Sequence, residues 1–221
     1  MNTNPTRTKS APVELQKYFR SANFIQSASS LADCPVQAGP EIAFAGRSNA
    51  GKSSAINRIT DNKKLAKTGK TPGRTQLINF FELKDGARLV DLPGYGFAKV
   101  SKQKKNNWQK HLLNYLEKRE TLAGLVLVMD SRHPLQAFDQ MMLDWAKTYS
   151  VPTLILLTKC DKLSKNAARK AYFEVEAHCS DIPQSAPLLF SSTSGEGLPQ
   201  ALQAISDTFS GAAEGSVQDI S

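Results

Sequence analysis

The stretch Gly46-Arg-Ser-Asn-Ala-Gly-Lys-Ser53 decides the fold, because it matches the phosphate-binding loop pattern of Gly, four residues, then Gly-Lys-Ser/Thr. Its two glycines let the backbone curl so that successive N–H groups point into one concavity. In this pattern Lys52 reaches the β- and γ-phosphates of a nucleotide, and the Ser53 hydroxyl binds Mg²⁺. A following helix directs its positive N-terminal end at the same phosphates.

The residues on either side supply the context that this motif requires. Glu41-Ile-Ala-Phe-Ala-Gly46 is a short apolar run typical of a buried strand, and Ser54-Ala-Ile-Asn-Arg-Ile-Thr60 is typical of a helix. A chance match in an unrelated turn would lack the order strand, loop, helix. We therefore interpret 46–53 as a phosphate-binding loop (phosphate loop).

Length and composition favour one soluble domain. The chain has 221 residues, of which 40% are hydrophobic and 22% charged, as is ordinary for a globular protein. Its apolar runs, such as 122–129, are too short to span a bilayer, and the polar residues 1–10 lack a signal core. We therefore expect a cytoplasmic protein without a membrane partner. Cys34, Cys160 and Cys179 lack metal-type spacing, which favours free thiols.

Positive charge is concentrated in one part of the chain. The net charge is +8, but residues 63–119 hold fourteen Lys or Arg against four acids, a local balance of +10. Such a segment suggests a polyanionic partner. A solvated lysine-rich face is the alternative that composition alone leaves open.

Apolar runs of strand length alternate with longer amphipathic stretches. The expected strands are 41–46, 77–83, 87–91, 123–129, 152–158 and 187–191, and the expected helices are 51–60, 102–119, 136–149, 164–179 and 197–209. This alternation predicts a three-layer α/β fold, with a mostly parallel six-stranded sheet and helices on both faces. The Asp85-Gly86 turn indicates a hairpin and hence one antiparallel edge strand. We expect flexible segments at 1–20 and 211–221 around a single domain at 21–210.

Asp91-Leu-Pro-Gly94 comes 39 residues after Lys52, at the end of an expected strand. An aspartate there can hold Mg²⁺ through a water molecule. Gly94 lets its N–H approach the γ-phosphate without a side chain in the way. The spacing from the phosphate loop turns a common turn sequence into a specific signal.

Thr158-Lys-Cys-Asp161 follows another expected strand and selects the base. Guanine presents two adjacent N–H donors that one carboxylate, Asp161, can accept, whereas adenine presents an acceptor. The stem of Lys159 can cover the flat face of the base. A helix cap formed by Asp161 is the alternative interpretation.

Two weaker signals complete the expected site. Backbone N–H groups of Phe190-Ser-Ser192 could reach the guanine O6, although a plain serine-rich turn is an equal alternative. Pro72 and Gly73 make 70–76 a loop, in which a threonine could complete the Mg²⁺ ligands. The residues themselves do not choose between Thr71 and Thr75.

Together these motifs resemble the EngB/YihA/YsxC family of bacterial ribosome-assembly GTP-binding proteins, among the TrmE-Era-EngA-EngB-septin-like GTPases. The resemblance covers about residues 20–210, and the stretches that carry it are 46–54, 71–75, 91–96, 130–134 and 158–161. It implies a P-loop GTPase domain (G domain). It also implies Thr75 and Ser53 as the side-chain ligands of Mg²⁺, and Lys52 as a catalytic residue.

The GTP-contacting residues that the resemblance implies are Gly46, Arg47, Ser48, Asn49, Ala50, Gly51, Lys52, Ser53, Gly73, Arg74, Thr75, Gln76, Leu77, Asp91, Leu92, Pro93, Gly94, Thr158, Lys159, Cys160, Asp161, Phe190, Ser191 and Ser192.

The sequence departs from the general GTPase pattern at two positions. Thr158 stands where the base motif usually has Asn, a variation common in the family resembled. Tyr95 stands where many GTPases use Gln to orient the attacking water, so slow intrinsic hydrolysis is expected. Asn49 could hold a K⁺ ion that replaces the missing stabilisation, as in related GTPases, or it could simply stabilise the loop turn.

Three other polar or aromatic residues have simpler interpretations. His133 lies in Asp130-Ser-Arg-His-Pro134, and without a neighbouring nucleophile it favours a structural turn over catalysis. Trp108 and Tyr115 could stack on RNA bases, but their helical spacing favours a core stripe.

The resemblance implies a GTP-dependent switch in large ribosomal subunit assembly, needed for normal cell division, with ribosomal RNA and protein as partners and no DNA sequence recognition. In such a switch GTP and Mg²⁺ order the loops 67–77 and 94–105. One alternative is a signalling or membrane-associated switch, although the C-terminal residues 217–221 carry no cysteine for lipidation. An ATPase or nucleotide kinase is the other, and Asp161 argues against it.

Overall fold

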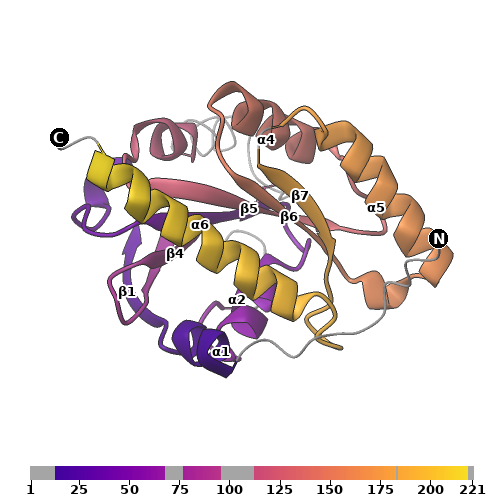
Figure 1. The fold of residues 1–221 in the computed structure, drawn as a ribbon, viewed down its shortest axis with the longest axis horizontal. Helices are drawn as coiled ribbons and strands as arrows, with labels where there is room; N and C mark the ends of the chain where they lie inside the picture. The colour runs from indigo at the N-terminus through magenta and orange to yellow at the C-terminus, as the bar shows by residue number, and fades with distance from the viewer. Residues whose placement is uncertain (1–12, 68–76, 96–111, 183, 219–221) are drawn as a thin grey trace.

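A seven-stranded sheet with the order β1-β3-β4-β2-β5-β6-β7 forms the centre of the molecule (Figure 1). The computed structural model describes residues 13–67, 77–95, 112–182 and 184–218. The strands are β1 (Asn23–Ala28), β2 (Glu41–Gly46), β3 (Ile78–Glu82), β4 (Arg88–Asp91), β5 (Leu122–Asp130), β6 (Thr153–Thr158) and β7 (Ser185–Leu189). The helices are α1 (Val13–Arg20), α2 (Lys52–Ile59), α4 (Ala137–Thr148), α5 (Lys165–Cys179) and α6 (Leu198–Gln218), and residues 112–118 are also helical.

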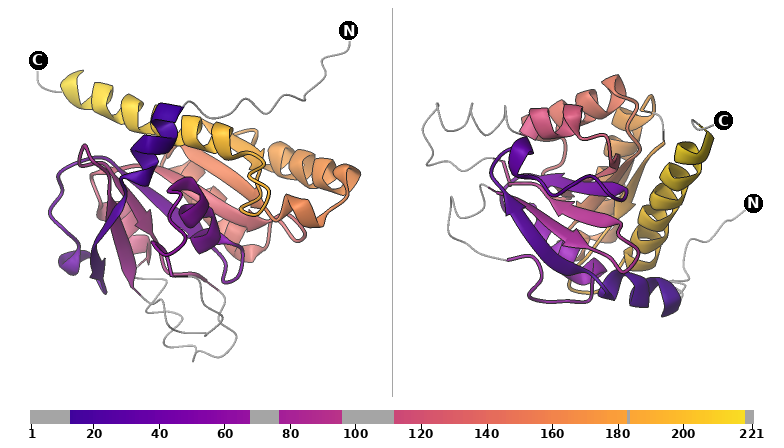
Figure 2. Two further views of the ribbon diagram at one scale, coloured as in Figure 1. Left: turned by 90° about the horizontal axis from the view of Figure 1, so that it is seen from below. Right: turned by 90° about the vertical axis from the view of Figure 1, so that its left-hand side faces the viewer.

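Helices cover both faces of the sheet, which confirms the predicted layers. α1, α2 and α6 pack on one face around Phe44 and Ile56, and α4, α5 and 112–118 pack on the other around Leu127. In the side views of Figure 2, α6 lies along one side of the sheet. Every residue of β2 is buried, because helices cover both of its faces, and this explains its continuous apolar sequence.

The sheet is mostly parallel, as predicted. β2 pairs in parallel with β4 and β5, β5 with β6, and β6 with β7. The predicted hairpin joins β3 and β4 antiparallel, and Gly86 in its turn has a φ of +86°, a conformation that favours glycine.

The predicted count of six strands was wrong, because the sheet has seven, whereas the predicted antiparallel pairing at the sheet edge is confirmed. β1 adds a seventh strand at the edge and pairs antiparallel with β3, so β3 runs against the others from the second position. Three consecutive residues of β1 are exposed. Its sequence, Asn-Phe-Ile-Gln-Ser-Ala, therefore carries neither a buried apolar run nor a clean alternation.

Helices extend into both end segments that were expected to be flexible. α1 lies within 1–20, and its Phe19 is fully buried because the helix packs against α2 and α6. α6 continues past residue 210 to Gln218. The extent of the single domain, placed at 21–210, stays a prediction.

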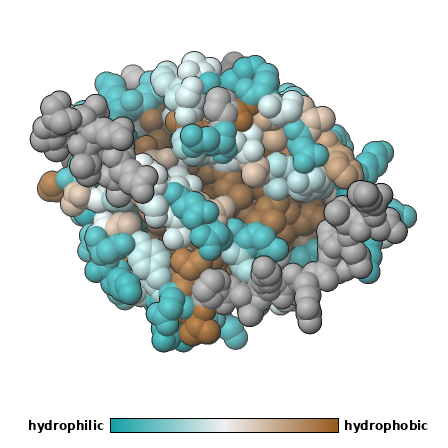
Figure 3. All heavy atoms as spheres, viewed as in Figure 1, coloured by the Kyte–Doolittle hydropathy of each residue, from teal (hydrophilic) through white to brown (hydrophobic). Residues whose placement is uncertain are grey.

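The helix expected at 102–119 is described only over 112–118. Tyr115 is fully buried there, which confirms the core interpretation, whereas Trp108 lies outside the described residues. Within the described part of the chain, no helix is both long and apolar enough to cross a membrane. On the face crossed by α6, hydrophobic surface appears near the middle, and most of the surface around it is hydrophilic (Figure 3).

Candidate functional site

The parallel strands bring the sequence motifs to one edge of the sheet. Because β2, β4, β5 and β6 run in the same direction, their carboxyl ends meet there. The phosphate loop follows β2, 92–95 follows β4, 131–134 follows β5, and 159–161 follows β6. Ligands of open α/β sheets bind outside these ends.

Backbone geometry explains the two glycines of the phosphate loop. A Cβ at Gly46 would lie 2.6 Å from the carbonyl oxygen of Val128, so only glycine fits where β2 passes β5. Gly51 has a φ of +103° and Asn49 a φ of +64°, both in the left-handed region. α2 begins at Lys52, directly after this curl, so its N-terminal end faces the loop.

The charged groups expected at the phosphates are close together and buried. Lys52 is 7% exposed and forms an ion pair with Asp91 at the end of β4. Ser53 is partly buried in the first turn of α2. An ammonium, a carboxylate and a hydroxyl therefore converge on this end of the sheet.

The segment after β4 is bonded to the phosphate loop. The N–H of Tyr95 donates to the carbonyl of Gly46 (3.3 Å), and the N–H of Ser48 donates to the carbonyl of Tyr95 (2.5 Å). The Tyr95 ring stacks on Phe138 of α4, with 4.7 Å between ring centroids and 9° between planes. The tyrosine that replaces the usual glutamine is thus held against a helix by its ring.

The hydroxyl of Thr158 connects the base motif to the phosphate loop. It lies within hydrogen-bonding reach of the carbonyls of Ala50 and Met129, the second at 2.9 Å. The side chain is buried, and its Cβ lies 3.5 Å from the position that a Cβ would take at Gly51. Thr158, which stands where the base motif usually has Asn, therefore positions that motif against the phosphate loop.

Asp161, the residue predicted to select guanine, is fixed by the turn that follows β7. The Ser191 hydroxyl donates to its carboxylate (2.7 Å) and accepts the N–H groups of Thr193 and Ser194. This hydrogen bond from Ser191, with a smaller contribution from Lys162, lowers the pKa of Asp161. The carboxylate is therefore ionised and presents an acceptor at neutral pH.

The side chains of Cys160 and Phe190 are buried inside the protein. Phe190 is fully buried and its carbonyl accepts the N–H of Cys160 at 3.4 Å. Burial, followed by the charge of Glu196, raises the pKa of the Cys160 thiol to about 12. Both residues position the backbone that leads to Asp161 and Ser191.

Asp130 organises the site in a way that the sequence analysis did not anticipate. Its carboxylate accepts hydrogen bonds from Arg132 (2.6 Å) and Lys159 (2.8 Å), and Lys159 also donates to the carbonyl of Asn49 (2.5 Å). Although burial acts to raise its pKa, these bonds hold it well below the usual range. Its signals in the sequence were its position at a strand end and its place in the stretch 130–134, which carries the family resemblance. His133 donates its N–H to the Asp130 carbonyl (2.9 Å), in agreement with a structural turn.

Part of the predicted site cannot be placed. Gly73, Arg74, Thr75 and Gln76 lie outside the described residues, and Thr71 with them. Leu77 is described, exposed, immediately before β3.

Comparisons with known proteins agree with this geometry. The model of a family described as 50S ribosome-binding GTPase matches residues 41–159, more than half of the chain. A Vibrio parahaemolyticus protein named "Probable GTP-binding protein EngB" is 50% identical over 196 residues, covering 87% of this chain and 88% of its own. A Coxiella burnetii protein of the same name is 49% identical over 206 residues, covering 93% and 98%.

Solved structures show the same fold. The crystal structure of a probable GTP-binding protein engB superposes with a TM-score of 0.64 at 23% identity, over 76% of this chain and 98% of that one. The G domain of the T. maritima FeoB iron transporter gives a TM-score of 0.52 at 26% identity, over 77% of this chain and 99% of that one. The family match and the two relatives near 50% identity show that this chain belongs to the EngB family of GTP-binding proteins.

Proposed function

We propose that this protein binds GTP, hydrolyses it slowly and acts in the cytoplasm as a nucleotide-dependent switch in assembly of the large ribosomal subunit. The observation that carries the nucleotide part is the meeting of Lys52, Thr158 and Asp161 at one sheet edge. The ribosomal part is supported by the name of the matched family, 50S ribosome-binding GTPase, and by the +10 balance of residues 63–119. A requirement in cell division belongs to the same proposal.

Guanine recognition follows from the ionised Asp161. Its carboxylate accepts both N–H donors of guanine, while Ser191 holds it in place. Adenine would present an acceptor to the same carboxylate, and a buried unpaired charge disfavours binding strongly. Lys159, held by Asp130 and Asn49, lies where its stem can cover the base.

The donor set suits Mg²⁺. The groups that converge are oxygen ligands, the Ser53 hydroxyl and the Asp91 carboxylate. No cluster of three or more His, Cys, Asp or Glu side chains that could hold a metal occurs in the ranges that the structure describes. Ser53 and Thr75 would hold the ion together with phosphate oxygens, as Mg²⁺ is usually held at nucleotides. When bound, the ion neutralises developing phosphate charge.

Hydrolysis is expected to be slow without help. Tyr95 has no amide to orient water, and its ring stacks on Phe138. Asn49, in the phosphate loop, is our candidate for holding a K⁺ ion beside the phosphates. Turnover measured in KCl and in NaCl at equal ionic strength should be faster in KCl, and equal rates would exclude this role.

Sedimentation with large ribosomal subunits tests the proposed partner. The protein is mixed with subunits in GTP or in GDP, across a series of salt concentrations. We expect nucleotide-dependent co-sedimentation that weakens steeply with salt, as phosphate contacts do. Absence of nucleotide-dependent co-sedimentation at low salt would leave a binding switch with another partner. If ADP competed with GDP for binding at a similar concentration, the result would instead support an ATPase or nucleotide kinase.

A further inference from the structure

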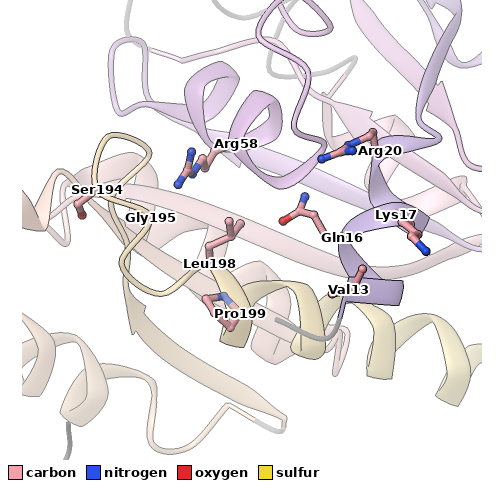
Figure 4. A pocket seen from close by; sticks show the side chains of 9 residues that line it. All are labelled: Val13, Gln16, Lys17, Arg20, Arg58, Ser194, Gly195, Leu198 and Pro199. Carbon is pink, nitrogen blue, oxygen red and sulfur yellow. The ribbon is translucent and has the colours of Figure 1, made fainter. Parts of the chain in front are cut away.

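A second pocket, of about 420 Å³, lies at the C-terminal end of α2 (Figure 4). Its walls come from α1, α2, the turn after β7 and the start of α6. Val13, Leu198 and Pro199 supply apolar surface, and none of the nine residues that line it is acidic. Its volume is in the range of small-ligand sites. No residue of the phosphate loop lines it, so it is a separate site.

The cationic side chains of this pocket are Lys17, Arg20 and Arg58. The Nε of Arg58 is buried without a hydrogen-bond partner among the described residues. A buried donor without a hydrogen bond costs free energy, so binding of a ligand that supplies an acceptor to Arg58 would be favoured. In Figure 4 the Arg20 guanidinium points toward Gln16 and Arg58, whereas Lys17 points away.

The other two cations have only exposed partners. Arg20 pairs with Asp61 and Lys17 with Glu14, and all four side chains are about half exposed or more. Exposed ion pairs contribute little, so they leave these charges available to a stronger anion. A guanidinium prefers phosphate, which it can bind through two parallel hydrogen bonds.

The pocket shares a turn with the guanine-selecting carboxylate. Gly195 lies against Arg58, since a Cβ at Gly195 would be 2.5 Å from Nη2 of the arginine. Gly195 donates its N–H to the carbonyl of Ser191 (2.9 Å), and the Ser191 hydroxyl holds Asp161. A ligand on Arg58 would therefore restrict the turn that positions the base.

We propose that this pocket binds a phosphorylated nucleotide unit of RNA and that its occupation slows release of GDP. The phosphate binds Arg58 and Arg20, and the nucleoside lies on Val13, Leu198 and Pro199. The choice of RNA as the source rests on the proposed ribosomal function. Coupling follows because a ligand that orders the shared turn lowers the entropy lost when the second ligand binds.

Calorimetry with the GDP-loaded full-length protein tests the site. The probes are uridine 5′-monophosphate, a uridine hexanucleotide and an acidic peptide of equal charge, none of which fits a guanine site. We expect the hexanucleotide to bind at least tenfold more tightly than the other two probes. Equal binding of the monophosphate would point to a free nucleotide, and equal binding of the peptide to a protein partner. Either result would overturn the proposal.

Three variants separate the pocket from the basic segment. Arg58→Gln should weaken hexanucleotide binding at least tenfold, and so should Val13→Trp, which fills the pocket from a position that is 67% exposed. Arg169→Gln is the matched control, since this exposed arginine lies on α5 over the opposite face. Unchanged binding in both pocket variants, with folding checked by circular dichroism, would refute the site.

Release of a fluorescent GDP analogue tests the coupling. The hexanucleotide should slow release severalfold from the wild type and leave release from Arg58→Gln unchanged. Equal slowing in both proteins would refute coupling through this pocket. These assays contain no ribosomes, so their failure is distinct from failed co-sedimentation with large subunits, which would count against the proposed function.

Discussion

The charged groups at the two ends of β2 have different surroundings. At its first residue, Glu41 is fully buried and bound to Arg88, Arg119 and Tyr115. At its last residue, Gly46, the chain turns into the phosphate loop, in which Asn49 and Gly51 have positive φ angles. The Glu41 end, the closed end, satisfies its charges within the protein. At the Gly46 end, the open end, we expect Lys52 and Asp91 to meet a ligand.

The closed end forms a network that joins distant parts of the chain. Arg119 donates to both carboxylate oxygens of Glu41 (2.8 and 2.6 Å) and to the carbonyl of Pro35 (2.7 Å). Arg88 donates to the carbonyl of Val36 (2.7 Å) and reaches Glu82. Burial, followed by the charge of Glu41, raises the pKa of Tyr115 well above its usual value, so its hydroxyl stays a donor. Removal of one member leaves buried charge unpaired.

The difference teaches that burial alone does not separate structural from functional charge. Lys52 and Asp91 are nearly as buried as Glu41 and Arg119, but they belong to the edge where loops converge. At the closed end two donors satisfy each carboxylate oxygen of Glu41. Substitutions at the closed end should therefore change stability, and those at the open end should change nucleotide affinity.

The largest expected effect is loss of stability in Glu41→Gln. Arg119 loses its counter-charge and Arg88 keeps only the partly exposed Glu82, so the free energy of unfolding should fall by about 3–5 kcal/mol. Urea unfolding measures it, and Glu14→Gln, which removes the exposed pair with Lys17, should cost less than about 0.5 kcal/mol. A change of similar size in both variants would remove the distinction between buried and exposed pairs.

Asp161→Asn should affect the open end alone. Loss of the carboxylate that accepts two guanine donors should weaken GDP binding by about 10² or more and improve binding of xanthosine diphosphate. Competition against fluorescent GDP measures both affinities, with the exposed Asp181→Asn as control. A large loss of unfolding free energy, with unchanged base preference, would place Asp161 among the structural charges.

Asp139 breaks the comparison. It lies in the first turn of α4 at the open end, is only 1% exposed, and its Oδ1 has no hydrogen-bond partner among the described residues. Burial raises its pKa to about 6, although the N–H of Gln136 and the charge of Arg47 act to lower it. Because the folded-state pKa of Asp139 is raised above the unfolded value, the uncharged carboxyl stabilises the fold. This stabilisation is fully present below about pH 4 and is lost as pH rises through about 6.

Asp139→Asn removes that titration. At pH 7.5 the variant should be more stable than the wild type, by on the order of 1–2 kcal/mol, since no buried charge remains. Urea unfolding at several pH values between 4 and 8 measures the difference, which should grow as the pH rises. Parallel curves for the two proteins would show that Asp139 does not titrate in this range.

The smallest effect is expected for Ser191→Ala. The variant keeps Asp161 but loses the hydroxyl that positions it, so GDP affinity should fall about tenfold. The neighbouring Ser192→Ala is the matched control, because the predicted contact of Ser192 with the base is made by its backbone N–H, which alanine keeps. Similar affinities in the two variants would show that the turn does not position the carboxylate.

Sequence patterns predicted the strands and motifs whose chemistry is local. The phosphate loop, the hairpin at Asp85-Gly86 and the buried strand β2 followed from residue types and spacing alone. β1 and α1 were missed, because their burial comes from partners far along the chain, β3 for one and α2 with α6 for the other.

The sequence by itself predicted a guanine-nucleotide site, because glycines, Lys52 and Asp161 act through their own chemistry. Only the tertiary structure decided how these groups are held. Thr158 reaches the phosphate loop across 108 residues, and Ser191 fixes Asp161 across 30. The pairing of Glu41 with Arg119 across 78 residues is of the same kind. Such contacts depend on strand order, which brings together residues that no local pattern relates.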